Sequence, residues 1–264
     1  LRTDEPAVLI ANHPYGILDG IAALTLAEDL GRPFKVLINK DLMKVPEIRP
    51  YALPIDFDAT RTATVTNLAT RKEAIRLLAA GTTIVVFPAG GVATAPNPLG
   101  RAVDLPWKGF VARLVRSAKA TVIPVYFVGQ CSPLFHAASR IGLTLRLSLL
   151  IHEFRRKAGS TITARIGPPV PFEMLRHRDD RKALLGELYD LVHRQADVAD
   201  VEVEGVAVEQ QEERRDEQQD EERAAIAGDL PDLLHHHGAD GGDHAAFPPR
   251  STTSRNTSSS DGDT

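Results

Sequence analysis

Residues 11–20 read Ala11-Asn12-His13-Pro14-Tyr15-Gly16-Ile17-Leu18-Asp19-Gly20. The apolar run before them, residues 7–10, predicts a buried strand, and the apolar spacing from Leu18 to Leu30 predicts a helix. The stretch is therefore expected to form the turn between a strand and a helix. It places one imidazole, that of His13, and one carboxylate, that of Asp19, close together in the chain.

The imidazole of His13 can accept a proton near neutral pH, but a catalytic histidine needs a partner that holds its tautomer and stabilises its charged form. Asp19 is a candidate partner, because in the first turn of the expected helix its negative charge faces the positive end of the macrodipole. The spacing fits an ordinary turn histidine and a helix-starting aspartate equally well. His13 and Asp19 are therefore a candidate catalytic pair that needs support from elsewhere in the sequence.

Strands and helices are expected to alternate along the chain. Apolar runs rich in β-branched residues predict strands at residues 7–10, 34–38, 53–56, 82–87, 121–128 and 160–166. Helical spacing predicts helices at residues 18–30, 64–80, 108–118 and 173–193. We expect an α/β fold, a three-layer αβα sandwich around a largely parallel mixed sheet. Functional groups gather at strand ends in such folds, so His13 and Phe87 should open onto the same edge of the sheet.

Five segments carry recognisable motifs. They are Asn12-His13 with Asp19; Asn39 to Pro50 with Leu53-Pro54-Ile55-Asp56; Phe87-Pro88-Ala89-Gly90-Gly91; Trp107 to Arg113; and Val122-Ile123-Pro124-Val125-Tyr126. Together they resemble the motif blocks of the glycerolipid acyltransferase superfamily, and most of all its bacterial branch of lysophospholipid acyltransferase-like, hemolysin-like proteins. The resemblance covers about residues 7–194 and implies a glycerol-3-phosphate acyltransferase-like fold.

This resemblance implies a bacterial enzyme of phospholipid biosynthesis. It would move a fatty acyl group from an acyl thioester, either acyl-CoA or acyl carrier protein, to a lysophospholipid or related lipid acceptor. His13 would be the general base and Asp19 its partner, with no bound cofactor and no metal. Substrate contacts are expected from Asn12, Lys40, Phe87, Pro88, Gly90, Gly91 and Lys108. The plainer interpretation of the two lysines is a surface position, and that of the two glycines is a turn with positive φ.

The sequence also departs from the family pattern. Five residues, not four, separate His13 from Asp19, and Phe57 stands where the family has an arginine. The third block has Ala89, Gly91 and Val92 in place of the glutamate, threonine and arginine that hold a phosphorylated acceptor in the family. A catalytically inactive lipid-binding member of the same fold is therefore the alternative. A serine hydrolase is disfavoured because the chain has no Gly-x-Ser-x-Gly motif.

Charge divides the 264-residue chain into two parts. Residues 1–194, the expected acyltransferase domain, carry a net charge of +9, whereas residues 195–264 carry −13. The second part is rich in Glu, Gln, Asp and Ser, and we expect an acidic, low-complexity, disordered tail. A basic domain is attracted to anionic lipid or to an acidic carrier protein, unless its charges are merely solvated. We expect a peripheral protein on the cytoplasmic face of the cell membrane that binds no nucleic acid.

One segment, from Ile141 to Phe154, is unusually apolar and is followed by Arg155-Arg156-Lys157. It can be a core element capped by a basic turn, which we favour. It can also be an acyl-chain groove or an interfacial segment whose basic end meets anionic lipid.

Overall fold

The computed structural model describes residues 5–197, and in this part of the chain strands alternate with helices. The strands are β1 (Ala7–Ala11), β2 (Phe34–Asn39), β3 (Ala52–Ile55), β4 (Thr83–Val86), β5 (Thr121–Phe127) and β6 (Ala164–Ile166). The α-helices are α1 (Ile17–Glu28), α2 (Arg61–Ala79), α3 (Phe110–Ala118), α4 (Pro133–Ile141), α5 (Leu143–Lys157) and α6 (Arg181–His193). Short 3-10 turns are η1 (Lys40–Lys44), η2 (Pro46–Tyr51), η3 (Phe172–Met174) and η4 (Arg194–Asp197).

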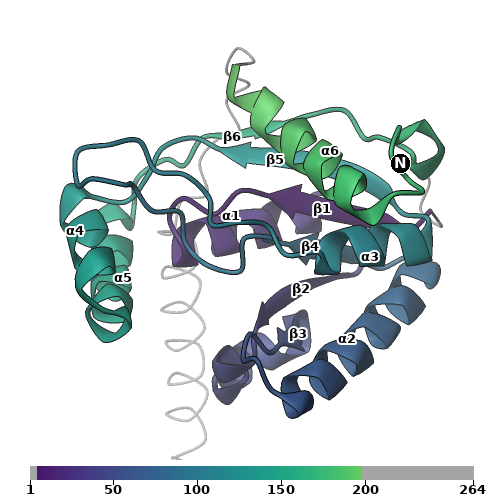
Figure 1. Ribbon diagram of the computed structural model, residues 1–264, viewed down its shortest axis with the longest axis horizontal. Coiled ribbons are helices and arrows are strands. Elements are labelled where there is room, and N and C mark those ends of the chain that lie inside the picture. Colours follow the sequence, from purple (N-terminus) through teal and green to yellow (C-terminus); the bar gives the residue numbers. More distant parts are fainter. Residues whose placement is uncertain (1–4, 198–264) are drawn as a thin grey trace, which may run out of the picture. The chain divides into compact units, whose positions relative to one another are not determined.

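The strands form one sheet in the order β3-β2-β4-β1-β5-β6. Neighbouring strands are parallel, except that the edge strand β6 runs antiparallel to β5. β1 lies inside the sheet, with Leu9 opposite Val85 of β4 and Ile123 of β5. Figure 1 shows helices on both sides of this sheet. The α/β sandwich around a mixed, mostly parallel sheet is therefore confirmed.

Both faces of the central strand are covered. Val8 and Ile10 belong to a core that includes residues of α2, α3 and α6, whereas Leu9 and Ala11 belong to a second core with α1. Every residue of β1 is buried. A strand covered on both faces is apolar at each position, which explains why residues 7–10 read as an unbroken apolar run.

The last predicted helix is shorter than its apolar spacing indicates. The sequence predicts a helix at residues 173–193, but α6 begins at Arg181. The carboxylate of Asp180 caps its first turn by accepting from the backbone amides of Lys182 and Ala183. The residues before it form the short turn η3 and a loop, because the Asp180 cap fixes where α6 can start.

The apolar segment at residues 141–154 lies mostly in α5, which packs beside α4 in what we call the α4–α5 pair (Figure 1). Leu149, Leu150 and Phe154 pack on a small core. Ile141 and Ile151, however, are 77% and 58% exposed. The prediction of a core element is therefore correct for the inner side of α5 and wrong for the outer side.

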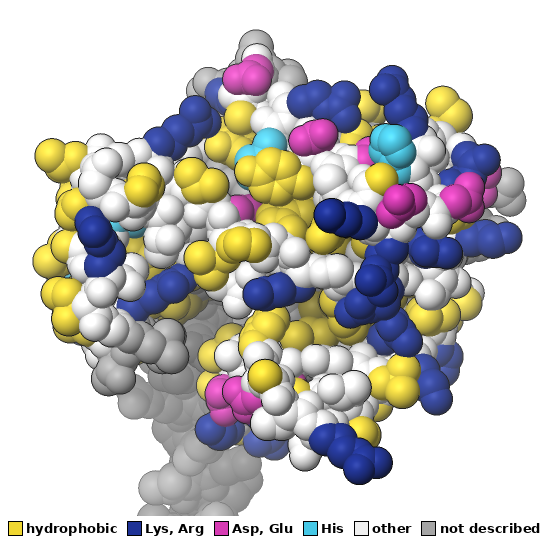
Figure 2. Space-filling view, viewed as in Figure 1, with side chains coloured by type: hydrophobic (Ala, Val, Ile, Leu, Met, Phe, Trp, Pro, Cys, Tyr) yellow, Lys and Arg dark blue, Asp and Glu magenta, His cyan; other side chains and the backbone are white. Residues whose placement is uncertain are grey.

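The expected tail lies outside the described residues apart from its first three, Gln195 to Asp197, which belong to η4. The boundary after Arg194 stays a prediction. Among the helices that the structure describes, none has the length and apolarity needed to cross a membrane. On the face shown in Figure 2, Lys and Arg side chains gather around the position of α3.

Candidate active site

His13 and Asp19 form a close pair at the carboxyl end of β1. Nδ1 of His13 lies 2.9 Å from Oδ1 of Asp19, whose side chain is fully buried. The other carboxylate oxygen of Asp19 accepts a hydrogen bond of 2.7 Å from the backbone amide of Tyr15. Neither Nδ1 of His13 nor Oδ1 of Asp19 has a hydrogen bond elsewhere in the described chain. The longer spacing between the two residues therefore does not separate them.

Gly16 lets the turn accommodate this spacing. It precedes α1 with φ 78° and ψ −102°, a conformation that side-chain-bearing residues rarely adopt. A Cβ atom at this position would lie 2.6 Å from Cδ1 of Leu150 and 2.9 Å from Cγ2 of Val92. The absence of a side chain at Gly16 is therefore required both by the backbone and by the packing of the turn.

The backbone of His13 is held by segments distant in sequence. Its amide donates to Oδ1 of Asp104 over 3.1 Å, and its carbonyl accepts from the amide of Ala93 over 2.7 Å. Its ring lies 4.4 Å from the ring of Phe87, measured between centroids. His13 and Phe87, which follow the neighbouring strands β1 and β4, thus lie together at one edge of the sheet, and the imidazole is held from several sides.

The electrostatic surroundings of His13 favour its protonated form. Burial lowers the pKa of His13, but the charge of Asp19, its contact with the ring and the charge of Asp104 outweigh this effect. The positive charge of Arg146 acts in the opposite direction. The net result is a pKa above the ordinary value of 6.5.

Asp104 also belongs to this candidate site, although no motif marks it in the sequence. Its side chain is only 2% exposed and lies 3.9 Å from Nε2 of His193. Its Oδ2 also accepts a hydrogen bond of 2.9 Å from the indole of Trp107. The only sequence signal is its place three residues before the Trp107 motif, in a loop without periodicity, so its link to His13 depends on tertiary folding.

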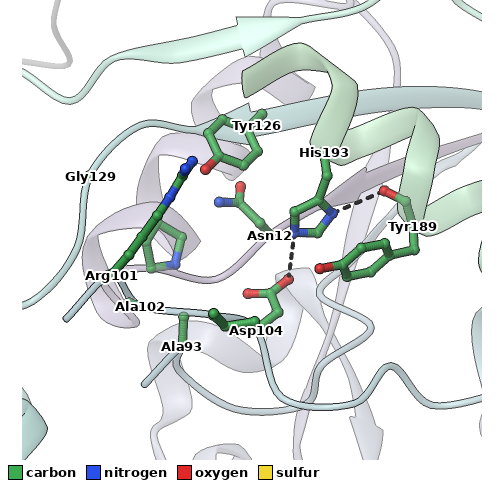
Figure 3. Close-up of a pocket in the computed structure, with 11 residues that line it drawn as sticks. Asn12, Ala93, Arg101, Ala102, Asp104, Tyr126, Gly129, Tyr189 and His193 are labelled. Atoms are coloured by element: carbon green, nitrogen blue, oxygen red, sulfur yellow. Dashed lines mark hydrogen bonds and ion pairs between the residues drawn. The ribbon is translucent and has the colours of Figure 1, made fainter. Parts of the chain in front are cut away.

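A cavity of about 270 Å³ lies beside this carboxylate (Figure 3). Its walls come from the end of β1, the loop before α3, the end of β5 and α6, and its polar lining includes Asn12, Arg101, Asp104, Tyr126, Tyr189 and His193. The ring of His193 stacks on Tyr189 at 3.7 Å. Asp104 therefore connects the cavity to the backbone of His13.

Asn12 joins two strand ends. Its amide nitrogen donates to the carbonyl of Phe127 over 3.0 Å, and its amide oxygen accepts from the backbone amide of Phe127 over 2.6 Å. These contacts hold the end of β1 against the end of β5. The substrate contact expected of Asn12 stays a prediction, because both of its polar groups are already in use.

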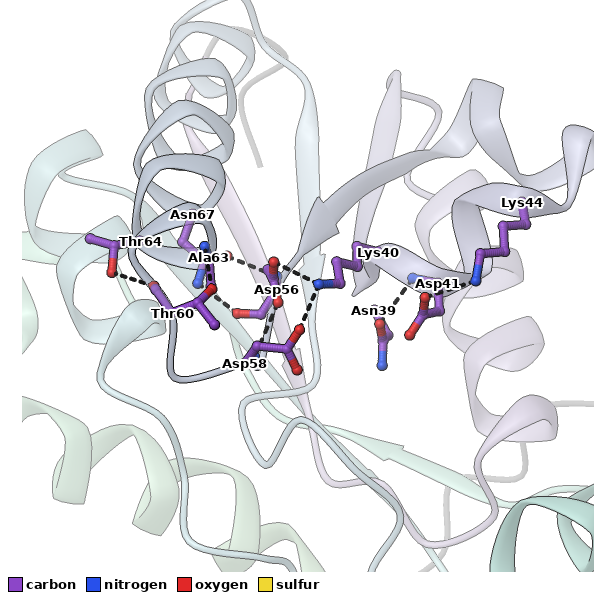
Figure 4. Close-up of polar contacts among 10 residues, drawn as sticks. All are labelled: Asn39, Lys40, Asp41, Lys44, Asp56, Asp58, Thr60, Ala63, Thr64 and Asn67. Carbon is purple, nitrogen blue, oxygen red and sulfur yellow. Dashed lines mark hydrogen bonds and ion pairs between the residues drawn. The ribbon is translucent and has the colours of Figure 1, made fainter. Parts of the chain in front are cut away.

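Lys40 lies at the end of β2, where two carboxylates surround it (Figure 4). Its Nζ is 2.8 Å from Asp56 and 2.7 Å from Asp58. The hydrogen bonds to Asp56 and then Asp58 raise the pKa of Lys40. β2 is separated from β1 by β4, so the structure does not bring Lys40 next to His13 in the sheet. Its predicted role in substrate binding would require displacement of these carboxylates.

The remaining predicted contacts lie in and around the third motif block. The carbonyl of Pro88 accepts from the backbone amide of Lys108 over 2.8 Å, while the Lys108 side chain is exposed. Gly90 has φ 68°, and a Cβ there would lie 2.6 Å from the ring of Phe57. A Cβ on Gly91 would lie 3.1 Å from Leu105. The glycine pair thus forms a tight turn beneath Phe57 and Leu105.

Arg146 of α5 brings a positive charge to this block, a contact that its place in the sequence does not indicate. Its Nη2 donates to the carbonyl of Val92 over 2.7 Å, and its guanidinium carbon lies 5.8 Å from the centre of the Phe135 ring. Burial lowers the pKa of Arg146, and no described carboxylate forms an ion pair with it. A cation therefore lies where the third block lacks its own polar side chains.

Comparison with known proteins identifies a family for the chain. A family model described as "Acyltransferase" matches residues 2–184, well over half of the chain. No curated protein matches the chain at a significant level. The match contains both His13 and Asp19, as well as the loop that supplies Asp104. The chain belongs to this acyltransferase family.

Proposed function

We propose that the protein transfers a fatty acyl group from an acyl thioester to the hydroxyl group of a lysophospholipid or related lipid. The observation that carries this proposal is the approach of 2.9 Å between His13 and Asp19 at the end of β1. A carboxylate beside Nδ1 holds the ring proton on that atom. Nε2 of His13 then has a free lone pair for the proton of an acceptor, and no described residue hydrogen-bonds to it.

The reaction needs no covalent intermediate on the protein. Nε2 of His13 takes the proton of the acceptor hydroxyl as its oxygen attacks the thioester carbonyl carbon. Asp19 stabilises the imidazolium that forms. The tetrahedral intermediate then collapses with cleavage of the carbon–sulfur bond, and the imidazolium returns its proton to the departing thiolate. The products are an ester and a free thiol, and His13 is neutral again.

Arg146 supports an anionic acceptor in this scheme. The loss of polar groups at Ala89, Gly91 and Val92 argues against a family-like phosphate site built from the third block alone. Arg146 supplies a guanidinium at the carbonyl of Val92 and has no described ion pair. Guanidinium groups bind phosphate and carboxylate well. We propose that Arg146 contacts the charged part of the acceptor.

Charge supports the acyl donor and the place of action that the resemblance to glycerolipid acyltransferases implies. Residues 1–194 carry a net charge of +9, which favours an acidic carrier protein, the phosphates of coenzyme A and anionic lipid headgroups. We propose acyl-CoA or acyl carrier protein as donor, and a peripheral position at the cytoplasmic face of the membrane. Nothing in the proposed chemistry requires a bound cofactor.

The test supplies labelled acyl-CoA and, separately, labelled acyl carrier protein to the full chain with a panel of lysophospholipids. Label should enter a phospholipid with one donor, and His13→Ala should abolish this transfer. Arg146→Gln should weaken turnover of anionic acceptors about tenfold more than that of an uncharged monoacylglycerol. Lipid binding without any thioester consumption would instead support the inactive lipid-binding alternative.

A further inference from the structure

The outer side of the α4–α5 pair is both apolar and basic. Four aliphatic side chains are well exposed there: Leu134, Ile141, Leu145 and Ile151. Arg140, Arg155 and Arg156 are exposed on the same two helices. We call these seven residues the outer face. Figure 2 shows hydrophobic and basic side chains next to each other over α4 and α5, at the left of the view.

The inner side of the same pair packs on the turn between β1 and α1, which carries His13. Leu150 fills the space beside Gly16, and Nη2 of Arg146 bonds to the carbonyl of Val92. Nζ of Lys157 lies 4.6 Å from the centre of the Tyr15 ring. α4 also begins only six residues after the end of β5, so the pair stands at the carboxyl edge of the sheet. A partner bound to the outer face would therefore lie next to the proposed reaction.

The charge of the pair is one-sided. Residues 133–157 contain five Lys and Arg residues and one acidic residue, Glu153. Glu153 is 1% exposed, and its carboxylate accepts hydrogen bonds from the backbone amide and the hydroxyl of Ser132. The segment therefore presents cations and aliphatic side chains to its surroundings without an exposed carboxylate.

We propose that the outer face docks on a lipid bilayer that contains anionic headgroups. Exposed aliphatic side chains enter the boundary between headgroups and acyl chains, while neighbouring arginines contact lipid phosphate. An acidic protein would match the arginines too, but a bilayer offers an anionic surface and an apolar layer next to each other, which suits arginines interspersed with Ile141 and Ile151. The proposal rests on the proposed function only in assuming that the substrate is a lipid, and the docking itself does not need the His13 chemistry.

The test measures sedimentation of the full chain with phosphatidylcholine vesicles, with and without phosphatidylglycerol. The wild type should bind the anionic vesicles more strongly, and less so as salt rises. Ile141→Gln with Ile151→Gln should weaken this binding about tenfold, because two aliphatic groups no longer insert. The matched control changes two similarly exposed residues elsewhere, Val65→Gln with Met174→Gln, and should bind like the wild type.

A second pair of variants tests the charges. Arg140→Gln with Arg155→Gln should weaken binding to anionic vesicles about tenfold at low salt. The control, Arg71→Gln with Arg181→Gln, removes two charges from α2 and α6 and should have a much smaller effect. All variants should melt at the wild-type temperature, because these side chains lie outside the cores.

The proposal is overturned if the wild type does not bind anionic vesicles, or if each control pair weakens binding as much as its outer-face pair. It is also overturned if the outer-face variants bind vesicles normally but no longer bind an acidic carrier protein. That result would assign the surface to a protein partner. Transfer to a soluble, short-chain acceptor should stay unchanged in the outer-face variants. If the wild type does not acylate this soluble acceptor at all, the result counts against the proposed function and not against the docking surface.

Discussion

Asp19 serves two groups with its two carboxylate oxygens. One oxygen lies beside Nδ1 of His13, and the other accepts from the backbone amide of Tyr15. The contact with Tyr15 fixes the carboxylate of Asp19 within the turn. Because the Asp19 side chain is fully buried, no solvent reaches its contact with His13. The chemistry proposed for His13 therefore depends on the backbone conformation of the few residues between His13 and Asp19.

The pH dependence of the reaction tests this pair. The pKa of His13 lies above 6.5, so the neutral base accumulates only as the pH rises through that higher value. We expect kcat/KM to rise with pH and to level off above the His13 pKa. Asp19→Asn removes the main group that raises the pKa, so the inflection should move to lower pH while the plateau falls about 100-fold. An inflection at the same pH in both proteins would show that Asp19 does not raise the pKa of His13.

Asp104→Asn tests the other carboxylate near His13. If its remaining oxygen keeps the bond to the His13 amide, its new NH2 group faces the indole N–H of Trp107. Two facing donors leave a buried bond unmade, and we expect a loss of about 1–3 kcal/mol in the free energy of unfolding. The pKa of His13 should fall as well, because the charge of Asp104 helps to raise it. Chemical denaturation and the pH profile are the measurements, with the exposed Asp179→Asn as control.

Single residues of the site were predictable to different degrees. His13, Asp19 and Phe87 were found because each follows a strand or begins a helix in a recognisable motif. Asp104 and Arg146 were not, because they reach the site from a loop and from a helix that only the folded chain brings there. The environments of Asn12 and Lys40 could not be predicted either, since their partners are backbone groups of β5 or carboxylates that follow β3.

At the scale of elements, α1 depends on its first turn. Gly16→Ala should destabilise the protein by about 1–3 kcal/mol, because Gly16 has φ 78° and a Cβ would collide with Leu150. It should also lower turnover by displacing Asp19. Gly20→Ala, in the first turn of α1, is the matched control. No atom lies within 4 Å of a Cβ placed at Gly20, so this change should stabilise the protein by about 0.5–1 kcal/mol. Thermal melting of both variants is the measurement. Equal changes in melting temperature would contradict the role given to Gly16.

The strands were the easiest elements to predict, and the α4–α5 pair the hardest. Strands buried on both faces leave unbroken apolar runs such as residues 82–87, which have few other interpretations. The apolar residues of α5 instead fall on two sides of one helix, one packed on the core and one exposed. The high count of apolar residues in this segment therefore predicts a core element, but it cannot show that the side chain of Ile151 is exposed.

At the scale of the whole molecule, the end of the domain can be located by truncation. Arg165 of β6 donates to the backbone carbonyls of Gln195 and Ala196. A chain cut after Arg194 loses these acceptors and should be less stable by about 1–2 kcal/mol. A chain cut after Asp197 should melt like the full chain, because the composition of residues 198–264 predicts no core. If the longer cut chain also melts early, the acidic segment contributes to the stability of the domain.

Asp19, Phe87 and the loop that carries Asp104 hold His13 in place at the edge of the sheet, and acyl transfer by its imidazole is the central proposal. The direct measurement is the rate of acyl transfer from a thioester to a lipid acceptor, by the wild type and by His13→Ala, with melting curves of both. We predict a loss of at least about 100-fold in turnover in a variant that still melts cooperatively, with a melting temperature lowered only because the buried carboxylate of Asp19 loses its partner. Turnover within a few-fold of the wild type would contradict the account.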